Sequence, residues 1–379
     1  MAKTVYLAHY DDQNKRYTSP AGIAVMSYII GALSRCEKKV TVLSSALSKT
    51  HAPMPRERLR LLDNVELLYP ALPACPHAKN YPARYLRRLR HARLLEDELL
   101  HLLEDGDTLV VYHDLSLIST VRRVRQKKRI RLVIQACEIY ADVNGKRQRK
   151  RELDFFALAD AYIFSSELLE QQINLKKAPF AICLGTYQSA PNLGGDRTND
   201  TKLRCVYAGT LDPRKGGAAA IKAASHLDQR YHLHLLGFGS EQQVKNIQRL
   251  IEQTAAQSTC TLSFDGCLSG EDYLRFLQSC DIGLCTQDPS ASFSATSFPS
   301  KILSYLANGL RVVSIRIPAV ENSAVGKQVL YYEQQTPEQI AQAIKGADLQ
   351  RAPDGREVID ALDRAFVQEL EKILRSPAV

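Results

Sequence analysis

The stretch SFPSKILSYLANGLRVVS, Ser297 to Ser314, predicts a short helix that runs directly into a β-strand. Pro299 suits the first turn of a helix and Gly309 suits the position just past its end, after which RVVS continues as a strand. The apolar residues that we expect to pack on a sheet are Ile302, Leu303 and Leu306. The stretch therefore predicts one helix–strand unit of a layered α/β fold.

The other side of this helix is polar. Ser300 and Ser304 are four residues apart, and Lys301 and Ser297 accompany them. A long polar loop, QDPSASFSATS, comes before the helix. Two interpretations stay open: this side holds a sugar hydroxyl or a phosphate, or it is an ordinary solvated face.

The same alternation of apolar runs and helical patterns extends along the whole chain. Continuous apolar strands separated by helices are typical of parallel sheets covered on both faces. A stretch rich in Gly, Pro and polar residues interrupts the pattern near the middle. We therefore predict an α/β fold of two Rossmann-like domains that face each other across a cleft, with a ligand at the carboxyl ends of the strands. The expected parts are an N-terminal domain 1–190, a linker 191–202, a second domain 203–355, and a C-terminal helix 356–379 that packs back on the first domain.

The bulk composition is that of a soluble protein in a reducing compartment. Of 379 residues, 45% are hydrophobic and 24% are charged, and no apolar run approaches the roughly 18 residues of a membrane span. The beginning of the chain lacks the apolar segment of a secretory signal. The nine cysteines are scattered and never form C-x-x-C, so we expect neither disulfides nor a zinc site. These features predict a cytoplasmic protein without a structural zinc site.

The positive charge is concentrated in the first half. Residues 1–191 contain 30 Lys and Arg against 20 Asp and Glu, whereas the rest contains 20 against 21. The basic clusters are ARYLRRLRHAR (83–93), RRVRQKKRIR (122–131) and KRQRKR (146–151). Solvated helix faces are one interpretation, and binding to an anionic membrane surface or an acidic acceptor is the other. We do not expect nucleic acid, because few aromatic residues are interleaved with the basic ones.

AGTLDPRKGG, Ala208 to Gly217, predicts an anion-binding turn. A strand is expected to end at Gly209, and Arg214 and Lys215 stand just before a helix that opens with glycine. Free N–H groups at a helix start, with two cations beside them, suit a phosphate. A surface turn with solvated basic residues is the alternative.

Two further patterns are weak on their own. LLGFGSE, Leu235 to Glu241, has a Gly-x-Gly after a strand but lacks the third glycine of the dinucleotide fingerprint. Asp105 and Asp107 form a D-x-D that comes before a predicted strand, so we interpret it as a turn.

Taken in order, the motifs of the second half resemble those of the C-terminal domain of GT-B glycosyltransferases, specifically the retaining family-4-like group in its F-P-S-K variant. The resemblance rests on VYAGTLDPRKGG, LHLLGFGSE, LSFDGCLSGEDYLRFLQSCDIGLC and SFPSKILSYLANGLRVVS, and it covers about residues 204–316. The first half resembles the family in its strand–helix order and in ADAYIFSSE. The resemblance implies transfer of a sugar from a nucleoside diphosphate sugar to a hydroxyl acceptor, a glycan or lipid-linked saccharide, with retention and without a metal or other cofactor. It also implies that domain 1–190 binds the acceptor and that domain 203–355 binds the nucleotide sugar.

The resemblance also implies roles for particular residues. Lys215 matches the basic residue that binds the donor diphosphate, and Arg214 would replace an arginine that the family has where Thr210 stands here. The two family glutamates would fall on Thr296 and Ser304, so both carboxylates are missing. The donor-binding residues implied in this way are Gly22, Gly209, Thr210, Gly237, Gly266, Cys267, Ser297, Ser300, Lys301 and Ser304.

Two residues of the first half are candidates for contact with the acceptor or the transferred sugar. His113 and Glu138 follow predicted strands at the expected ligand edge. A core histidine and a helix-capping carboxylate are the alternatives for these two positions.

Three alternative functions remain at this level. The missing carboxylates also fit a non-catalytic partner subunit of GT-B shape, the same pocket would serve a nucleotide-sugar epimerase, and an NAD-dependent dehydrogenase shares the fold type but not the fingerprint. The nucleotide base, the sugar, the acceptor and the oligomeric state leave no recognisable signature in the sequence.

Overall fold

The computed structural model describes residues 3–50, 52–73, 81–144, 148–194, 201–291, 294, 297–349 and 355–375. The chain divides into two compact units. Unit 1 consists of Met1–Leu184 together with Ala365–Val379, and unit 2 is Gly185–Arg364. The division after Leu184 comes a few residues before the boundary that we expected at residue 190.

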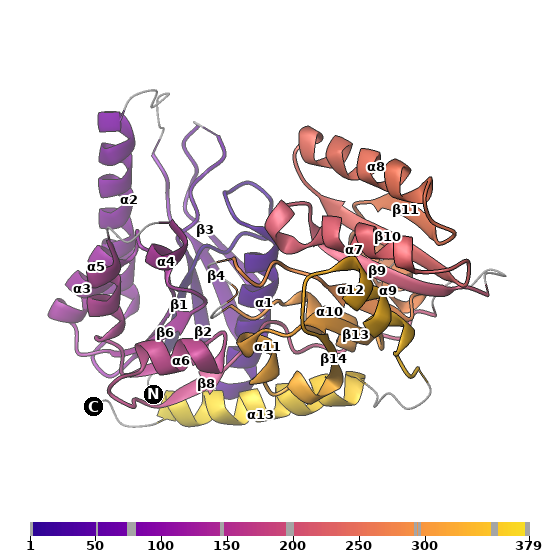
Figure 1. The fold of residues 1–379 in the computed structure, drawn as a ribbon. Helices are drawn as coiled ribbons and strands as arrows, with labels where there is room; N and C mark the ends of the chain where they lie inside the picture. The colour runs from indigo at the N-terminus through magenta and orange to yellow at the C-terminus, as the bar shows by residue number, and fades with distance from the viewer. Residues whose placement is uncertain are drawn as a thin grey trace. The chain divides into compact units, whose positions relative to one another are not determined.

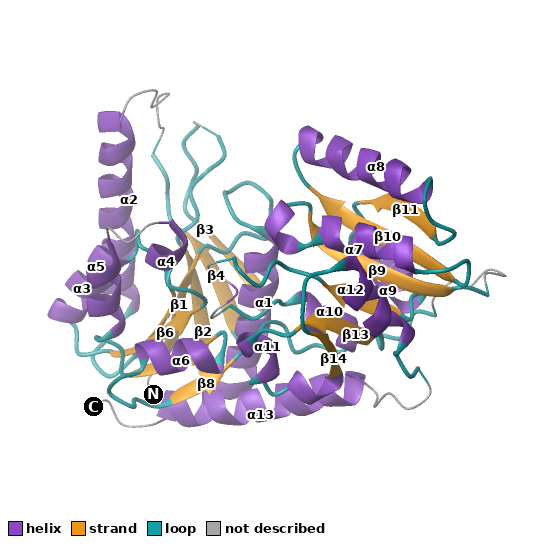
Figure 2. Cartoon of the chain, in the orientation of Figure 1, coloured by secondary structure: helices purple, strands orange, loops and turns teal. Residues whose placement is uncertain are grey.

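Unit 1 contains an eight-stranded sheet in the order β3-β4-β2-β1-β5-β6-β7-β8 (Figures 1 and 2). All neighbouring strands are parallel except the pair β3 and β4, which is antiparallel. The strands are β1 Thr4–Ala8, β2 Val40–Ser44, β3 Glu57–Leu62, β4 Val65–Tyr69, β5 Thr108–Tyr112, β6 Arg131–Ala136, β7 Ala161–Phe164 and β8 Phe180–Ile182. The helices are α1 Pro20–Cys36, α2 Tyr81–Leu102, α3 Ile118–Lys127, α4 Tyr140–Asn144, α5 Arg149–Phe156 and α6 Glu167–Ile173.

The hydrophobic core of unit 1 follows from the apolar strands. Val5, Leu7, Leu109 and Val111 are inaccessible and form one cluster with the apolar sides of α2, α3 and α5. Burying side chains on both faces explains why these strands are continuous apolar runs, because neither face of a covered sheet meets water. The antiparallel β3–β4 hairpin, joined by Asp63 and Asn64, was missing from the sequence prediction.

Unit 2 contains a six-stranded, all-parallel sheet in the order β11-β10-β9-β12-β13-β14. Its strands are β9 Leu203–Thr210, β10 Tyr231–Phe238, β11 Thr261–Gly266, β12 Ile282–Cys285, β13 Arg311–Ile315 and β14 Val329–Tyr332. Its helical elements are η2 Pro213–Lys215, α7 Gly217–Ala223, η3 Ala224–His226, α8 Glu241–Ala255, α9 Gly270–Gln278, α10 Lys301–Ala307, α11 Pro318–Glu321, η5 Gly326–Gln328, α12 Pro337–Lys345 and the first part of α13 Gly355–Arg375.

The last helix, α13, passes from one unit into the other. Its residues from Ala365 onward belong to unit 1. There the ring of Phe366 lies 5.6 Å from that of Tyr28 in α1, measured between centroids, and the Cys36 thiol contacts the carbonyl oxygen of Val367 at 3.6 Å. The chain therefore returns to its first unit at its C-terminal end. No helix in the described part of the chain is long and apolar enough to cross a bilayer.

Candidate functional site

The turn between β9 and α7 is fixed by its own capping contacts. Asp212 accepts a hydrogen bond from the backbone N–H of Arg214 at 2.9 Å, which begins the 3-10 turn η2. Gly216 ends that turn with φ 92°, a left-handed conformation that favours glycine. A Cβ atom on Gly216 would lie 1.6 Å from the carbonyl oxygen of Thr286, which follows β12. The glycine therefore lets this turn pack directly against the end of β12.

Arg214 forms an ion pair within the turn that carries it. Its guanidinium pairs with the Asp212 carboxylate, with Nη2 2.7 Å from Oδ2 and Nε 3.1 Å from Oδ1. The Arg214 side chain is 61% exposed. Because the nearest carboxylate is two residues away, a local ion pair holds this cation at the surface. The anion contact expected for Arg214 stays a prediction.

Lys301, at the start of α10, turns its ammonium group inward. The Nζ atom lies 3.7 Å from the centroid of the Tyr207 ring in β9, and it would lie 3.1 Å from a Cβ atom built on Gly209. Part of the Lys301 side chain is accessible, but Nζ is buried and has no hydrogen-bond acceptor among the described residues. Burial, together with the nearby charge of Lys215, lowers the pKa of Lys301 to about 8.

Tyr207 connects Lys301 with the turn that carries Lys215. Its hydroxyl lies 3.0 Å from the carbonyl oxygens of both Thr210 and Lys215, and burial raises its pKa to a value well above the usual range. Since one tyrosine contacts both segments, the turn and the first residue of α10 meet at the carboxyl ends of β9 and β12. The structure thus brings Lys215, Lys301, Gly209 and Thr210 together in one place.

The apolar face that the sequence predicts for helix α10 is confirmed, whereas its polar face differs from the prediction at Lys301. Ile302, Leu303 and Leu306 are buried. Ser300 is exposed, Ser297 and Ser304 are partly buried, and the Ser304 hydroxyl lies 3.3 Å from that of Tyr273. Lys301 was expected on the wet side with the serines, but its ammonium lies inside against Tyr207. Thr296, the position of the first missing carboxylate, lies outside the described residues.

The remaining predicted glycines lie at neighbouring strand ends of unit 2. A Cβ atom on Gly237, in β10, would lie 2.1 Å from the carbonyl oxygen of Gly209, so the two strands approach closely here. Gly266 ends β11 with φ 73°, and Cys267 after it is exposed. Gly266 and Cys267 thus occupy the same edge of the sheet, two strands away from β9.

In unit 1 Gly22 lies in the first turn of helix α1. Ser19 caps α1, and its hydroxyl accepts a hydrogen bond from the backbone N–H of Gly22 at 3.1 Å. The hydroxyl oxygen of Tyr112, at the end of β5, would lie 3.8 Å from a Cβ atom on Gly22. Gly22 therefore lies at the carboxyl edge of the unit 1 sheet.

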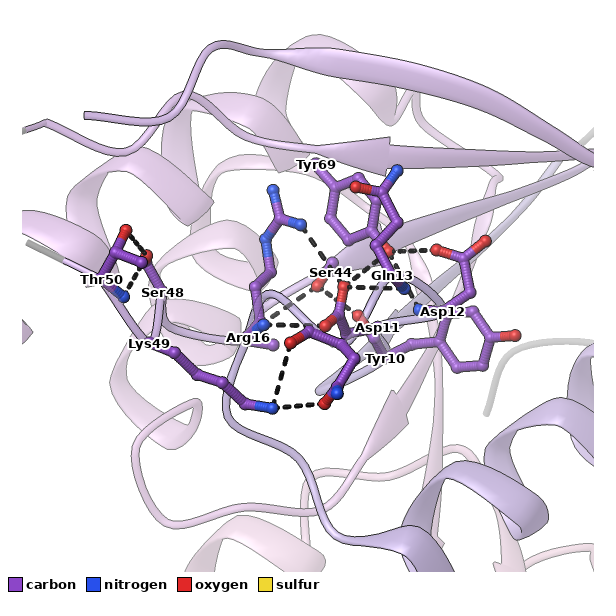
Figure 3. Close-up of polar contacts among 12 residues, drawn as sticks. Tyr10, Asp11, Asp12, Gln13, Arg16, Ser44, Ser48, Lys49, Thr50 and Tyr69 are labelled. Atoms are coloured by element: carbon purple, nitrogen blue, oxygen red, sulfur yellow. Dashed lines mark hydrogen bonds and ion pairs between the residues drawn. The ribbon is translucent and has the colours of Figure 1, made fainter. Parts of the chain in front are cut away.

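A buried ionic cluster, which the sequence analysis missed, holds the loop between β1 and α1 (Figure 3). Asp11 and Arg16 are both fully buried, with Nη1 3.4 Å from Oδ1. The guanidinium carbon lies 3.5 Å from the centroid of the Tyr69 ring. The Tyr69 hydroxyl lies 3.0 Å from Asp11 Oδ1 and 2.7 Å from Asp12 Oδ1. Burial and the contact with Asp12 raise the pKa of Tyr69 well above its usual range.

Replacing Arg16 by methionine is expected to lower the free energy of unfolding by about 2–3 kcal/mol, because Asp11 would stay buried without its counter-charge. Urea unfolding of the two proteins measures the difference. Arg60→Met is the control, since Arg60 and its partner Asp63 are exposed and such a pair contributes about 0.5 kcal/mol. Equal losses in both variants would show that the cluster has no special role.

His113 and Glu138 follow the strands as predicted, but His113 lies in the core. Only 2% of its surface is exposed, and its Nε2 lies 2.8 Å from Glu152 Oε1. Glu152 also accepts the backbone N–H groups of Tyr140 and Ala141 at 2.8 and 2.9 Å, which fixes the start of α4. The structure therefore gives His113 a core contact, the alternative that the sequence analysis kept open. Glu138 is partly buried in the loop after β6.

Within the described residues no group of three or more His, Cys, Asp and Glu side chains could hold a metal ion. The described cysteines are free thiols. Asp105 and Asp107 contact neighbouring backbone: Asp105 accepts the N–H of Arg129 at 2.9 Å, and Asp107 accepts that of Glu104 at 2.8 Å. These contacts agree with the turn that we expected for the D-x-D motif.

Residues 202–347 match the family model described as Glycosyl transferases group 1. The resemblance to GT-B glycosyltransferases is confirmed. The matched segment begins just before β9 and includes every strand of the unit 2 sheet, together with the turn that carries Lys215 and helix α10. No curated protein sequence matches the chain significantly.

Solved structures resemble the chain over its whole length. An apo structure of OtsA has a TM-score of 0.69 at 13% identity, with 100% of both chains covered. A structure described as trehalose-6-phosphate from E. coli bound with UDP-2-fluoro glucose has a TM-score of 0.70 at 12% identity, again with 100% of both chains covered. Anabaena Alr3699/HepE in complex with UDP and glucose has a TM-score of 0.63 at 14% identity, with 98% of each chain covered. At these identities the likeness concerns the fold, and it confirms the two Rossmann-like units of GT-B type.

Proposed function

We propose that this protein transfers a sugar from a nucleoside diphosphate sugar to a hydroxyl acceptor, a glycan or a lipid-linked saccharide, with retention at the anomeric carbon and without a metal. The observation that carries the proposal is the meeting of Lys215 and the buried ammonium of Lys301 at the strand ends of unit 2. A buried cation without an acceptor is costly unless an anion completes it. A diphosphate supplies such an anion, and the similar structures include complexes with UDP and with UDP-2-fluoro glucose.

The two lysines would act on the leaving group. Negative charge grows on the diphosphate as its bond to the sugar breaks, and cations fixed beside it stabilise that charge more than they stabilise the intact donor. Lys301 is held by Tyr207, and the backbone of Lys215 is held by the same tyrosine. An acceptor hydroxyl that attacks from the side of the departing diphosphate would give retention.

Nucleoside diphosphates test the donor site without knowledge of the sugar. A thermal-shift screen of UDP, GDP and ADP is expected to show one base preferred, since a ligand at 100 times its dissociation constant stabilises by about 2.7 kcal/mol. Proton NMR of the product formed from the matching sugar nucleotide then gives the anomeric configuration, and the reaction should persist in EDTA. An inverted product or loss of activity in EDTA would contradict the finer parts of the proposal.

Lys215→Ala is expected to slow turnover by about 10- to 100-fold, because one charge-assisted contact contributes about 1.5–3 kcal/mol. Steady-state kinetics at saturating and at limiting donor measures the effect. Lys222→Ala is the matched control, since Lys222 is an exposed lysine on the adjacent helix α7. Unchanged turnover in Lys215→Ala would remove this lysine from the mechanism.

A non-catalytic partner subunit is the second candidate, and Ser304 favours it. Where the family has a carboxylate, the Ser304 hydroxyl contacts that of Tyr273. Isothermal titration separates the candidates: no heat with any nucleotide sugar, together with a stable partner in pull-down, would favour the subunit. An epimerase would instead convert the nucleotide sugar into its isomer without an acceptor, which NMR detects.

A further inference from the structure

The three basic clusters of unit 1 differ in how the structure neutralises them. In the cluster on α3, Arg123 and Lys127 both pair with Glu96 of α2, and Arg125 pairs with Asp160 at 2.7 Å. Carboxylates of the protein itself therefore balance much of this charge. An internally paired cation has little attraction left for an external anionic surface.

The same holds for charges at the edges of this helical layer. Arg129 lies 3.6 Å from Asp105, and Arg149 of α5 lies 2.9 Å from Asp142. Arg129 is exposed and Arg149 is partly exposed, so both look available on the surface. Their partners nevertheless offset their charge within the molecule.

The N-terminal half of α2 is different. Arg88, Arg90 and Arg93 are exposed, and no ion pair or hydrogen bond of these side chains is found among the described residues. Leu86 and Leu89 on the same turns are 53% and 41% exposed. Leu86 and Leu89 are therefore exposed next to three arginines for which no partner is found in the described part of the chain.

The helical spacing places four of these residues along one side. Leu86, Leu89, Arg90 and Arg93 follow the i, i+3, i+4, i+7 pattern, so their side chains share one stripe. Farther along, Leu95 and Leu99 are buried in the core cluster of unit 1. Figures 1 and 2 show the N-terminal turns of α2 extending beyond α3 and α5, with only the later turns beside them. The helix is thus anchored at one end and presents a basic, partly apolar stripe at the other.

We infer that this stripe of α2, Leu86 to Arg93, docks on an anionic lipid bilayer. Arginines attract the negative surface of a bilayer, and leucines between them enter the boundary of headgroups and acyl chains. The long aliphatic stems of arginine can lie on the apolar region while their guanidinium groups reach the phosphates. A purely polar partner such as RNA would leave the two leucines without a contact. This inference extends the proposed function by placing the enzyme at a membrane that carries the acceptor.

Co-sedimentation of the full chain with vesicles tests the inference. We expect binding to phosphatidylcholine vesicles that contain phosphatidylserine, weak binding to vesicles of phosphatidylcholine alone, and a loss of binding as salt increases. Arg90→Gln combined with Arg93→Gln should weaken binding by about 30-fold, the equivalent of about 1 kcal/mol for each arginine. Leu86→Ser combined with Leu89→Ser should also weaken binding, because the apolar contacts with the boundary of headgroups and acyl chains are lost.

The matched control is Arg129→Gln combined with Arg149→Gln, which removes the same number of arginines, each paired with a carboxylate and at least partly exposed. This variant should bind vesicles within about threefold of the unchanged protein. An equal loss in the control, binding that ignores phosphatidylserine, or full binding by the leucine variant would each overturn the inference. Nucleoside diphosphate binding is measured on the same proteins: if it persists while vesicle binding is absent, the docking surface is wrong and the proposed function stands.

Discussion

Replacing Lys301 by methionine is expected to stabilise the protein and, at the same time, to weaken its binding of nucleoside diphosphates. The ammonium group is buried without an acceptor among the described residues, and its pKa falls to about 8. A fall from 10.5 to about 8 corresponds to a cost of about 3 kcal/mol for keeping the charge inside. The Tyr207 ring offsets part of this cost, so we expect a gain of about 2 kcal/mol in the free energy of unfolding at neutral pH.

The lowered pKa of Lys301 also predicts how the stability of the folded protein changes with pH. The folded protein releases the Lys301 proton near pH 8, whereas the unfolded chain keeps it up to about pH 10.5. Between these values the unfolded state binds more protons, so the unchanged protein should gain stability as the pH rises from 8 to 10.5. Lys301→Met removes this rise. Urea unfolding of both proteins across this range measures it.

The same substitution should weaken binding of the preferred nucleoside diphosphate by about 10- to 150-fold, because a charge-assisted contact contributes about 1.5–3 kcal/mol. A diphosphate favours the charged lysine, so the affinity of the unchanged protein should hold below pH 8 and decrease above it. Lys345→Met, a change at an exposed lysine that ends α12, is the control for both measurements. Destabilisation by Lys301→Met with unchanged affinity would show that Lys301 is a structural residue.

Gly216→Ala is expected to destabilise the protein more than Arg16→Met does. The new Cβ would lie 1.6 Å from the carbonyl oxygen of Thr286, and φ at this position is +92°. Backbone atoms on both sides must move apart, since neither is the end of a flexible side chain. We expect a loss of more than about 4 kcal/mol, together with loss of nucleoside diphosphate binding, because the turn carrying Lys215 is displaced.

Gly106→Ala is the control that separates two causes of destabilisation in Gly216→Ala, the collision of the new Cβ atom and the left-handed backbone conformation. Gly106 has φ +91°, nearly the same value, but nothing lies within 4 Å of a Cβ atom there. This control therefore bears only the cost of a left-handed alanine, about 1–2 kcal/mol. Urea unfolding of the two variants gives the difference. Similar losses at both positions would mean that the contact between the turn and Thr286 is looser than the structure shows.

Much of the fold is readable from local patterns. Apolar runs between amphipathic helices predicted two parallel sheets, and Pro299 and Gly309 framed a helix found at Lys301–Ala307. The β3–β4 hairpin was missed because β3 is an edge strand without a continuous apolar run. Every second side chain of β3 is partly buried and the others are exposed. Its signal was the two-residue Asp63-Asn64 loop between Arg-Leu alternation and an apolar run.

Side-chain direction was the part that the sequence could not provide. Lys301 shares a helix face with serines, yet the strand ends beneath it leave room for its ammonium against Tyr207, a residue almost a hundred positions earlier. Arg214 pairs with Asp212, two residues earlier in the same turn, and the sequence analysis did not foresee this ion pair. The Asp11–Arg16–Tyr69 cluster joins segments that lie far apart in the chain. Such contacts depend on strand order, which periodicity alone does not specify.

A crystal structure of the protein with its preferred nucleoside diphosphate tests the central claim most directly. We predict the diphosphate at the carboxyl ends of β9 and β12, with phosphate oxygens about 3 Å from the Nζ atoms of Lys215 and Lys301. A diphosphate bound elsewhere on the chain, or bound at this edge with Lys301 still buried against Tyr207 and out of contact, would contradict the account.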